Sequence, residues 1–242
     1  MVAVNLLESR GLSKSFAGLD AVTDVNFALP EGQIRAIIGP NGAGKSTFVG
    51  MLCGRIPATR GEIFFAGKQI TDWPAHRRIS SGMAYTFQIT SVFAGLSTRE
   101  NVALAARRVY RRDHVRVQAA TDEALAKVGL ANRQEQLAGD LAYGHQRLLE
   151  IAMGLVQSPR LFILDEPTQG LAESEIEGFK SLIQTLGRSS TILLIEHNMD
   201  VVMETAQFIT VLDQGRTLAE GTAEAIRVNA EVQAAYLGTD NA

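Results

Sequence analysis

The glycine-rich segment at residues 39–46 constrains the fold more than any other feature of this chain. It reads Gly39-Pro40-Asn41-Gly42-Ala43-Gly44-Lys45-Ser46 and matches the pattern G-x-x-x-x-G-K-[ST]. A short apolar run, Ile34 to Ile38, broken only by Arg35, precedes it, and Lys45 to Leu52 follows at helical spacing. This order predicts a strand, a loop and a helix, in which backbone N–H groups and the helix N-terminus surround an anion. We therefore predict a phosphate-binding loop inside an α/β core.

Lys45 and Ser46 carry the side-chain chemistry of this predicted loop. We expect Lys45 to reach the β and γ phosphates of a nucleotide and the Ser46 hydroxyl to contact Mg²⁺. A chance glycine turn is the alternative interpretation, but the flanking strand and helix patterns argue against it. The predicted ligand is ATP with Mg²⁺, and the predicted activity is ATP hydrolysis.

Two carboxylates end a second buried strand. Leu161-Phe162-Ile163-Leu164 is followed by Asp165 and Glu166. An apolar strand can deliver Asp165 beside the phosphate loop, where it holds Mg²⁺ through water. Glu166 then lies near the γ phosphate as the base for the attacking water. By itself, an acidic strand end is commonly a solvated loop start, but the phosphate loop upstream favours the catalytic interpretation.

Two further polar residues follow predicted strands. His197 comes after Leu193-Leu194-Ile195-Glu196, and Gln88 comes after Tyr85-Thr86-Phe87. A histidine in such a place is often a structural, hydrogen-bonded residue, but beside the other groups a contact with the γ phosphate is the better hypothesis. Gln88 is a candidate contact for the metal or the attacking water, with an ordinary surface glutamine as the alternative.

The remaining pattern predicts one domain of mixed architecture, an α/β P-loop NTPase core with an N-terminal antiparallel β subdomain and an inserted α-helical subdomain. Alternation around Val22 to Leu29 indicates a half-exposed strand, and Thr191 to Ile195 indicates another buried one. Residues 98–156 have helical rhythm without a convincing strand. We assign 1–87 and 158–242 to the core and 88–157 to the insert. Asp213-Gln214-Gly215 predicts a hairpin turn between 208–212 and 216–220.

Composition excludes several classes of function. The formal net charge of -3 gives no general attraction for nucleic acid, so none is expected as a partner. Cys53 is the only cysteine, which rules out an internal disulfide, and a small buried residue is its expected role. No run approaches the roughly 18 apolar residues that a membrane span needs. We expect a cytoplasmic protein that reaches a membrane only through another protein.

Together, these motifs resemble the ATP-binding subunit of an ABC transporter, and the resemblance covers roughly residues 6–238. In the family's order the matching segments are Gly39 to Thr47 (Walker A), Gln88 (Q-loop), Leu141-Ala142-Tyr143-Gly144-His145 (signature), Leu161 to Asp165 (Walker B), Glu166 (catalytic carboxylate) and His197 (switch histidine). Thr47 joins the nucleotide-binding residues by this resemblance. Phe16 matches the aromatic residue that stacks on adenine in the family, with core packing as the alternative.

The signature segment departs from the family's usual Leu-Ser-Gly-Gly-Gln. Ala142 lacks the hydroxyl, Tyr143 replaces a glycine and His145 replaces the glutamine. Gly144 is kept, so backbone donors and the helix dipole can still bind phosphate. Ala172 stands where an aspartate is common.

The resemblance also implies partners. In the family two ATPase subunits close around two ATP molecules and drive membrane-spanning permeases. We expect such permeases, a second ATPase subunit that is identical or similar, and, indirectly, a solute-binding protein. The motif details look most like importers of branched-chain amino acids or of related small polar solutes such as urea and amides. The alternatives are an ATPase for lipid or lipopolysaccharide export and a soluble ABC ATPase outside transport.

A dense basic stretch lies within the predicted helical insert. It contains Arg107, Arg108, Arg111, Arg112 and Arg116. A solvated helix face is the simpler interpretation. Contact with a permease loop or with lipid headgroups is the alternative.

Overall fold

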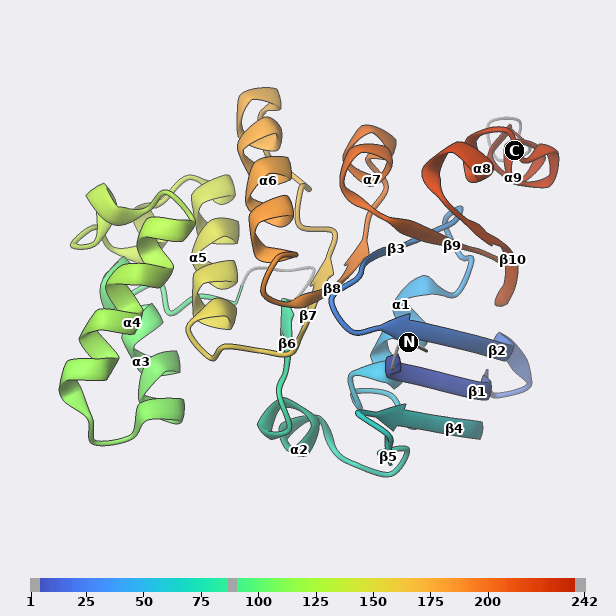
Figure 1. The fold of residues 1–242 in the computed structure, drawn as a ribbon, viewed down its shortest axis with the longest axis horizontal. Coiled ribbons are helices and arrows are strands. Elements are labelled where there is room, and N and C mark those ends of the chain that lie inside the picture. The colour runs from blue at the N-terminus through green and yellow to red at the C-terminus, as the bar shows by residue number, and fades with distance from the viewer. Residues whose placement is uncertain (1–4, 87–90, 238–242) are drawn as a thin grey trace.

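Two β-sheets and a group of helices make up the fold (Figure 1). The computed structural model describes residues 5–86 and 91–237. Within these ranges one sheet has four strands in the order β2-β1-β4-β5, and the other has six in the order β10-β9-β3-β8-β7-β6. The mixed α/β fold class and its antiparallel β part are therefore confirmed.

The strands are β1 (Asn5–Phe16), β2 (Leu19–Pro30), β3 (Ile34–Ile38), β4 (Arg60–Phe65), β5 (Lys68–Gln69), β6 (Met83–Thr86), β7 (Leu161–Asp165), β8 (Thr191–Ile195), β9 (Phe208–Asp213) and β10 (Arg216–Gly221). The α-helices are α1 (Lys45–Leu52), α2 (Ala75–Ser80), α3 (Thr98–Tyr110), α4 (His114–Lys127), α5 (Tyr143–Leu155), α6 (Glu173–Leu186), α7 (Met199–Thr205), α8 (Ala223–Arg227) and α9 (Ala230–Leu237). Two 3₁₀ turns lie at Ala131–Arg133 and Ala138–Asp140.

The six-stranded sheet is the parallel core that the sequence predicts. Its neighbouring strands from β9 through β6 pair in parallel, and β10 closes the edge as an antiparallel hairpin with β9. The predicted strands at β3, β7 and β8 and the turn at 213–215 are therefore confirmed. Because the carboxyl ends of parallel strands meet at one edge, the loops after β3, β7 and β8 come together there.

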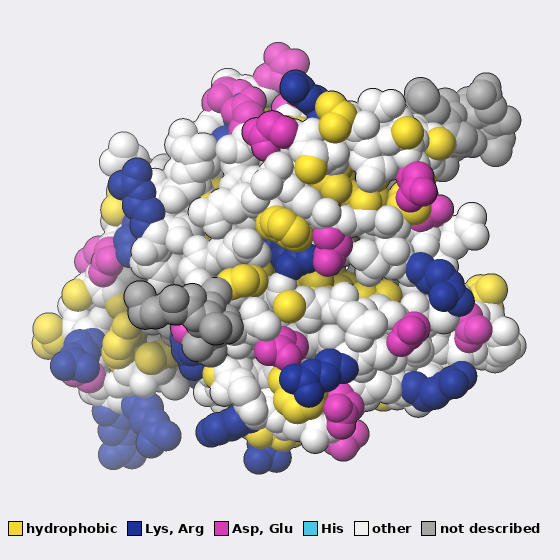
Figure 2. All heavy atoms as spheres, turned by 45° about the vertical axis from the view of Figure 1, so that its right-hand side comes forward, with side chains coloured by type: hydrophobic (Ala, Val, Ile, Leu, Met, Phe, Trp, Pro, Cys, Tyr) yellow, Lys and Arg dark blue, Asp and Glu magenta, His cyan; other side chains and the backbone are white. Residues whose placement is uncertain are grey.

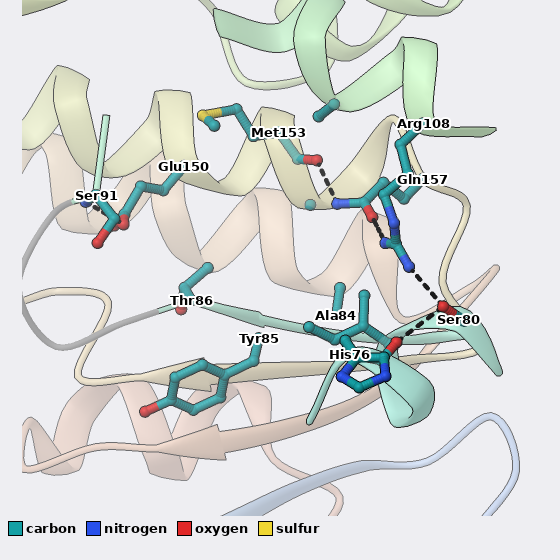
Figure 3. Close-up of a pocket in the computed structure, with 13 residues that line it drawn as sticks. His76, Ser80, Ala84, Tyr85, Thr86, Ser91, Arg108, Glu150, Met153 and Gln157 are labelled. Atoms are coloured by element: carbon teal, nitrogen blue, oxygen red, sulfur yellow. Dashed lines mark hydrogen bonds between the residues drawn. The ribbon is translucent and has the colours of Figure 1, made fainter. Parts of the chain in front are cut away.

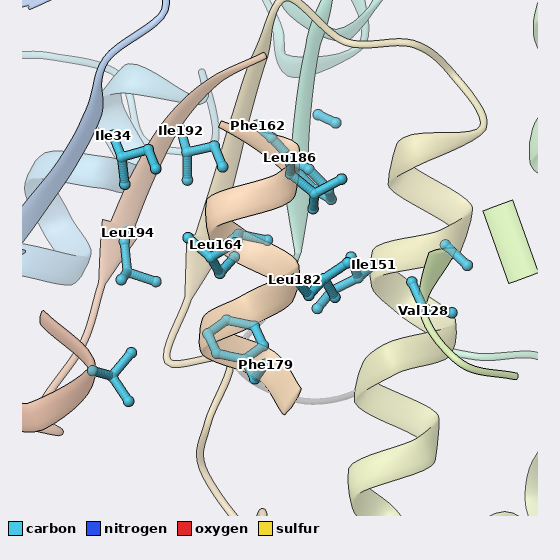
Figure 4. Packing of buried hydrophobic residues seen from close by; sticks show 14 of the residues in the cluster. Ile34, Val128, Ile151, Phe162, Leu164, Phe179, Leu182, Leu186, Ile192 and Leu194 are labelled. Atoms are coloured by element: carbon cyan, nitrogen blue, oxygen red, sulfur yellow. The ribbon is translucent and has the colours of Figure 1, made fainter. Parts of the chain in front are cut away.

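Alternating side chains of the core strands enter two different apolar clusters. Along β7, Phe162 and Leu164 belong to the cluster shown in Figure 4, whereas Leu161 and Ile163 face the cluster that contains α1 and the antiparallel sheet. Side chains of α6, such as Phe179, cover the first face. A strand buried on both faces must be apolar throughout, which explains the unbroken hydrophobic runs in the sequence.

Arg35 interrupts the apolar run of β3 because it joins the two sheets. Its guanidinium lies between the rings of Phe27 on β2 and Phe208 on β9, at 4.6 and 4.7 Å from their centroids. It also pairs with Glu220 on β10 and donates to the hydroxyl of Thr210 at 2.9 Å. A buried arginine is tolerated here because an acid balances its charge, oxygen atoms accept from its N–H groups, and aromatic rings cover its guanidinium.

The helical part lies between β6 and β7. It contains α3, α4 and α5, and α3 begins with a capping box in which Glu100 N–H donates to Ser97 Oγ at 3.1 Å and Ser97 N–H to Glu100 Oε2 at 2.8 Å. The helices predicted for this region are present. The assignment of 88–157 as a separate subdomain stays a prediction, and Gln88 lies outside the described residues.

Charges of both signs are scattered over the face of the molecule in Figure 2, and basic side chains gather at its lower left edge. Within 5–86 and 91–237, no helix is at once long and apolar enough to cross a bilayer.

The helix that follows the phosphate loop is anchored at its far end by Arg78. The Nη1 atom of this buried guanidinium donates to the carbonyl oxygens of Met51 and Leu52, each at 2.7 Å. Both carbonyls belong to the last turn of α1, where helical partners are missing. Cys53 follows directly and is buried as expected, and burial raises the pKa of its thiol to about 12. The hydrogen bonds of Arg78 to the C-terminal end of α1 therefore help to fix the position of this helix and of the loop that precedes it.

Candidate functional site

The predicted phosphate loop borders a cavity of about 620 Å³ at the carboxyl edge of the parallel sheet. Residues 41–47 line it together with Glu166, His197, the start of β2 at residues 19–21 and the turn residues 214–215. Ser46 is exposed there at the start of α1. The structure therefore brings together segments that are far apart in the sequence, from Leu19 to Gly215. The volume of the cavity lies in the range of small-molecule sites.

The shape of the loop depends on its glycines. Gly44 has φ of 93°, and a Cβ there would lie 2.4 Å from the carbonyl oxygen of Ala21. A Cβ at Gly39 would lie 2.0 Å from the carbonyl oxygen of Leu212. Gly42, with φ of 79°, faces open space. Only glycine allows this backbone path and leaves its N–H groups accessible to an anion.

Lys45 places a buried cation at the centre of the loop. Its side chain is almost fully buried, and Nζ donates to the carbonyl oxygens of Gly39 at 2.6 Å and Pro40 at 3.0 Å. Burial lowers the pKa of Lys45, and the nearby carboxylates of Glu166 and Asp165 oppose that shift. Neutral carbonyls solvate an ammonium less well than phosphate oxygens do, so the site fits a polyphosphate.

Glu166 and His197 both line this cavity and contact each other there. The His197 Nε2 and Glu166 Oε1 atoms are 2.9 Å apart, and Glu166 N–H donates to the carbonyl oxygen of Ile195 at 2.8 Å. Glu166 has φ of 47°, an uncommon conformation for a residue with a side chain. The side chain of His197 is 43% exposed and that of Glu166 is 13% exposed. A carboxylate held in this way can accept a proton from a water molecule in the cavity.

Glu196 organises these two loops, a role that the sequence interpretation missed. Its buried carboxylate accepts hydrogen bonds from the N–H and hydroxyl of Thr168, and from the N–H groups of His197 and Asn198. The loop after β7 and the loop after β8 are thereby tied together. The only sequence signal was an acid between an apolar strand and a polar loop, which does not reveal its partners.

Asp165 lies behind Glu166 and does not line the cavity itself. Its Oδ2 atom accepts a hydrogen bond from the hydroxyl of Tyr85 at 2.6 Å, and its N–H donates to Thr86 Oγ1 at 3.3 Å. Burial raises the pKa of Asp165, while the Tyr85 hydrogen bond opposes this. In turn, Nη1 of Arg55 donates to the Tyr85 hydroxyl at 2.7 Å. Sequence reasoning did not identify Tyr85 or Arg55 as part of the site.

The donor set near the loop fits Mg²⁺ only when a nucleotide contributes ligands. In the part of the chain that the structure describes, no group of three or more His, Cys, Asp and Glu side chains could hold a metal ion. Magnesium commonly takes one or two carboxylates together with substrate phosphates and water. Ser46, which lines the cavity, and Asp165, which directly precedes the lining residue Glu166, match that set of donors.

Replacing Tyr85 with phenylalanine should raise the Mg²⁺ concentration needed for half-maximal nucleotide binding by about tenfold to a hundredfold. The hydroxyl fixes one carboxylate oxygen of Asp165, and a hydrogen bond to a charged group contributes about 1.5–3 kcal/mol. Mg²⁺ titrations of a fluorescent ATP analogue measure this, with Tyr110→Phe on α3 as the matched control. An Mg²⁺ dependence identical to that of the wild type would show that Asp165 needs no such support.

The residues at 142–145 lie apart from this cavity. Ala142 is the exposed N-cap of α5 and makes no side-chain cap, and Tyr143 packs against Gly170, where a Cβ would lie 2.7 Å from the ring. A Cβ at Gly144 would lie 2.8 Å from Glu175 Oε2, so a larger residue here would displace the side chain of Glu175. His145 lines a different hollow beside residues 131–136. Their contact with nucleotide therefore stays a prediction.

Phe16 ends β1 close to the mouth of the cavity. Its side chain is 45% exposed, and Nζ of Lys14 lies 4.8 Å from the ring centroid. The alternative of core packing is therefore wrong. In the β1–β2 ladder Phe16 is the backbone partner of Leu19, which lines the cavity. Gln88 cannot be placed, because it lies outside the described residues.

A second hollow, of about 440 Å³, lies between α2, β6, α3 and α5 (Figure 3). Tyr85 and Thr86 form part of its wall, and both contact Asp165. Glu150 forms another part, accepting from Ser91 N–H at 2.6 Å and from Nη1 of Arg147 at 3.1 Å. The hollow is thus connected by direct hydrogen bonds to the strand end that carries Asp165.

Comparison with known sequences gives consistent matches over the whole chain. Residues 22–169 match the family described as ABC transporter, and residues 216–242 match the family described as branched-chain amino acid ATP-binding cassette transporter. The chain is 39% identical to the high-affinity branched-chain amino acid transport ATP-binding protein BraF of Pseudomonas aeruginosa, covering 96% of this chain and 98% of that protein. It is 38% identical to LivG of Escherichia coli, with the same coverage.

Solved structures give the same result for the fold. An ATP-binding cassette of an ABC transporter in its ADP conformation superposes with a TM-score of 0.87 at 25% identity, covering 97% of this chain and 99% of that chain. A nucleotide-free ATP-binding cassette superposes with a TM-score of 0.86 at 24% identity, covering 96% and 98%.

Proposed function

The chain belongs to the ABC transporter family of ATP-binding subunits and is an ATPase, and from this premise we propose that it powers an importer of branched-chain amino acids or a related small polar solute. One observation carries the ATP-hydrolysing role on which this proposal depends: the loop at 41–47, Glu166 and His197 line a single cavity.

In the proposed reaction, residues of the loop bind the phosphates of ATP. N–H groups of residues 39–44 and the N-terminus of α1 surround the phosphate oxygens, and Lys45 exchanges its carbonyl partners for the β and γ phosphates. Thr47 contributes from the first turn of the helix. Ser46 and Asp165, with Gln88, would hold Mg²⁺, which when bound neutralises charge that develops on the phosphate oxygens.

Glu166 is the proposed general base. Its carboxylate takes a proton from the water that attacks the γ phosphate, and the contact with His197 keeps it directed into the cavity. His197 is exposed enough to contact the γ phosphate itself. Phe16 is the proposed stacking partner of adenine, since its ring is exposed and its strand partner Leu19 lines the cavity.

We also propose that two ATPase subunits, identical or similar, close around ATP. The segment Ala142, Tyr143, Gly144 and His145 lies away from the cavity of its own chain, so it is available to the nucleotide of a partner subunit. The N-terminal N–H groups of α5 supply donors and a positive dipole end even without the usual serine hydroxyl. An ATP that contacts both subunits stabilises the closed dimer.

The hollow in Figure 3 is the proposed contact for a permease segment. A partner seated there would touch Tyr85 and Thr86, which hold Asp165. It would also touch Glu150, whose partner Arg147 lies 5.7 Å from the ring centroid of Tyr143. The same contact would therefore affect both Asp165, the proposed Mg²⁺ ligand, and Tyr143, which belongs to the segment proposed to face the second subunit.

We propose that this ATPase subunit acts on the cytoplasmic face of the membrane, where its permeases hold it.

The names of the relatives and the match of residues 216–242 support branched-chain amino acids as the solute. Deleting the gene should abolish high-affinity uptake of radiolabelled leucine, isoleucine and valine, because the permeases lose their energy source. Plasmid-borne wild-type protein should restore uptake, and a Glu166→Gln variant should not. Unchanged uptake of all three with a defect in envelope lipids, or in no transport at all, would instead support the export or the non-transport alternative.

A further inference from the structure

The turn between α3 and α4 carries the densest positive charge of the chain. Arg107, Arg111, Arg112 and Arg116, which we call the arginine cluster, are all exposed, and Arg108 is adjacent. Between 107 and 116 there are five arginines and one acid, Asp113, whereas the whole chain has a net charge of -3. The basic character is therefore a local property of this turn.

The arginines at the tip of the turn are not used by the fold. The side chains of Arg111 and Arg112 make no hydrogen bond or ion pair with any residue in the described ranges, while Arg116 has a 3.4 Å contact with Asp113. Arg111 has φ of 51° and ψ of -109°, a conformation that is strained for a residue with a Cβ. A glycine would relieve that strain, so packing does not explain an arginine at this position.

Exposed apolar side chains alternate with the charges. Val109 is 43% exposed and Val115 is 78% exposed, at the end of α3 and the start of α4. A turn that presents valines among arginines matches the composition of surfaces that lie at the membrane interface, where apolar groups enter the headgroup region and basic groups pair with phosphates. A solvated helix face would not need the valines.

The cluster adjoins the hollow proposed for the permease. Arg108, next to the cluster in sequence, also lines the hollow. It donates to Ser80 Oγ on α2 at 3.0 Å and to the side-chain oxygen of Gln157 after α5 (Figure 3). Figure 1 places the α3–α4 turn on the same edge of the molecule as α2, and Figure 2 shows basic side chains gathered there. If a permease occupies the hollow, this edge faces the membrane.

We propose that the arginine cluster, with Val109 and Val115, binds anionic lipid headgroups of the membrane that surrounds the permease. This inference rests on the proposed function, because the permease brings the edge to the bilayer. Phosphate oxygens of the lipids accept from the guanidinium groups, and the valines enter the headgroup region. The contact steadies the subunit against the membrane surface.

Vesicle sedimentation of the full chain without permease tests the proposal directly. The protein should sediment with vesicles of phosphatidylcholine and phosphatidylglycerol, not with phosphatidylcholine alone, and binding should fall as salt rises. The double variant Arg111→Gln/Arg112→Gln should bind anionic vesicles about tenfold to thirtyfold more weakly. Arg188→Gln/Arg227→Gln, two exposed arginines elsewhere, is the matched control and should bind like the wild type.

ATP hydrolysis of the same proteins separates this inference from the proposed function. The double variant should keep wild-type hydrolysis in solution, because neither arginine touches the cavity. Equal binding of the wild type and the double variant to anionic vesicles would overturn the lipid contact and leave the ATPase assignment intact. Lost copurification with the permease in detergent, together with unchanged vesicle binding, would assign the cluster to a permease loop and would also overturn it.

Discussion

Replacing Glu166 with glutamine should lower steady-state ATP hydrolysis by about 10²- to 10⁴-fold and leave ATP binding intact, since this range is typical of a lost general base. The amide has nearly the same shape as the carboxylate and can still contact His197 Nε2, which lies 2.9 Å from the carboxylate in the wild type. It cannot accept a proton from water. ATP should therefore remain uncleaved between two closed subunits.

Light scattering after gel filtration with Mg²⁺ and ATP should detect this trapped dimer, and phosphate release measures the loss of hydrolysis. The matched control is Glu224→Gln, an exposed acid on α8 that does not line the cavity. Hydrolysis at the wild-type rate by the Glu166 variant would show that another group activates the water and would remove the proposed base.

The parts of the fold that depend on local pattern could be predicted from the sequence. The strands β3, β7 and β8 are mostly apolar because both faces of the sheet are covered, and the turn at 213–215 has hairpin chemistry. The phosphate loop could be predicted for the same reason: its glycines and Lys45 are contiguous, so their chemistry is visible without knowing the tertiary contacts.

The parts of the site that depend on distant contacts could not be predicted. Tyr85 reaches Asp165 across 80 positions, and Glu196 binds Thr168 across 28. Neither Tyr85 nor Glu196 belongs to a recognisable motif. If another strand lay beside it, each would be an ordinary residue at or near the end of a strand. Phe16 is a different case, because the sequence did identify it but left two interpretations, adenine stacking and core packing. An aromatic residue in a strand fits either, and its exposure in the structure excludes core packing.

Replacing Lys45 with alanine should raise the dissociation constant for ATP by about 10²-fold or more, because two charge-assisted contacts of about 1.5–3 kcal/mol each are lost. Among the described residues that line the cavity, Lys45 is the only lysine or arginine, so no other lysine or arginine there takes its place. Calorimetric titration with Mg-ATP measures the change. Lys127→Ala, an exposed lysine on α4, is the matched control.

In the Lys45 variant the carbonyl oxygens of Gly39 and Pro40 lose the hydrogen bonds that Nζ of Lys45 donates to them. The stability of the variant must therefore be checked by thermal unfolding. A folded variant that binds ATP with wild-type affinity would contradict the role of Lys45. Because Lys45 acts in binding and Glu166 acts only on bound ATP, the double variant Lys45→Ala/Glu166→Gln should form no trapped dimer at ATP concentrations that trap Glu166→Gln alone. A dimer trapped as readily as in the single variant would mean that backbone N–H groups alone hold the phosphates.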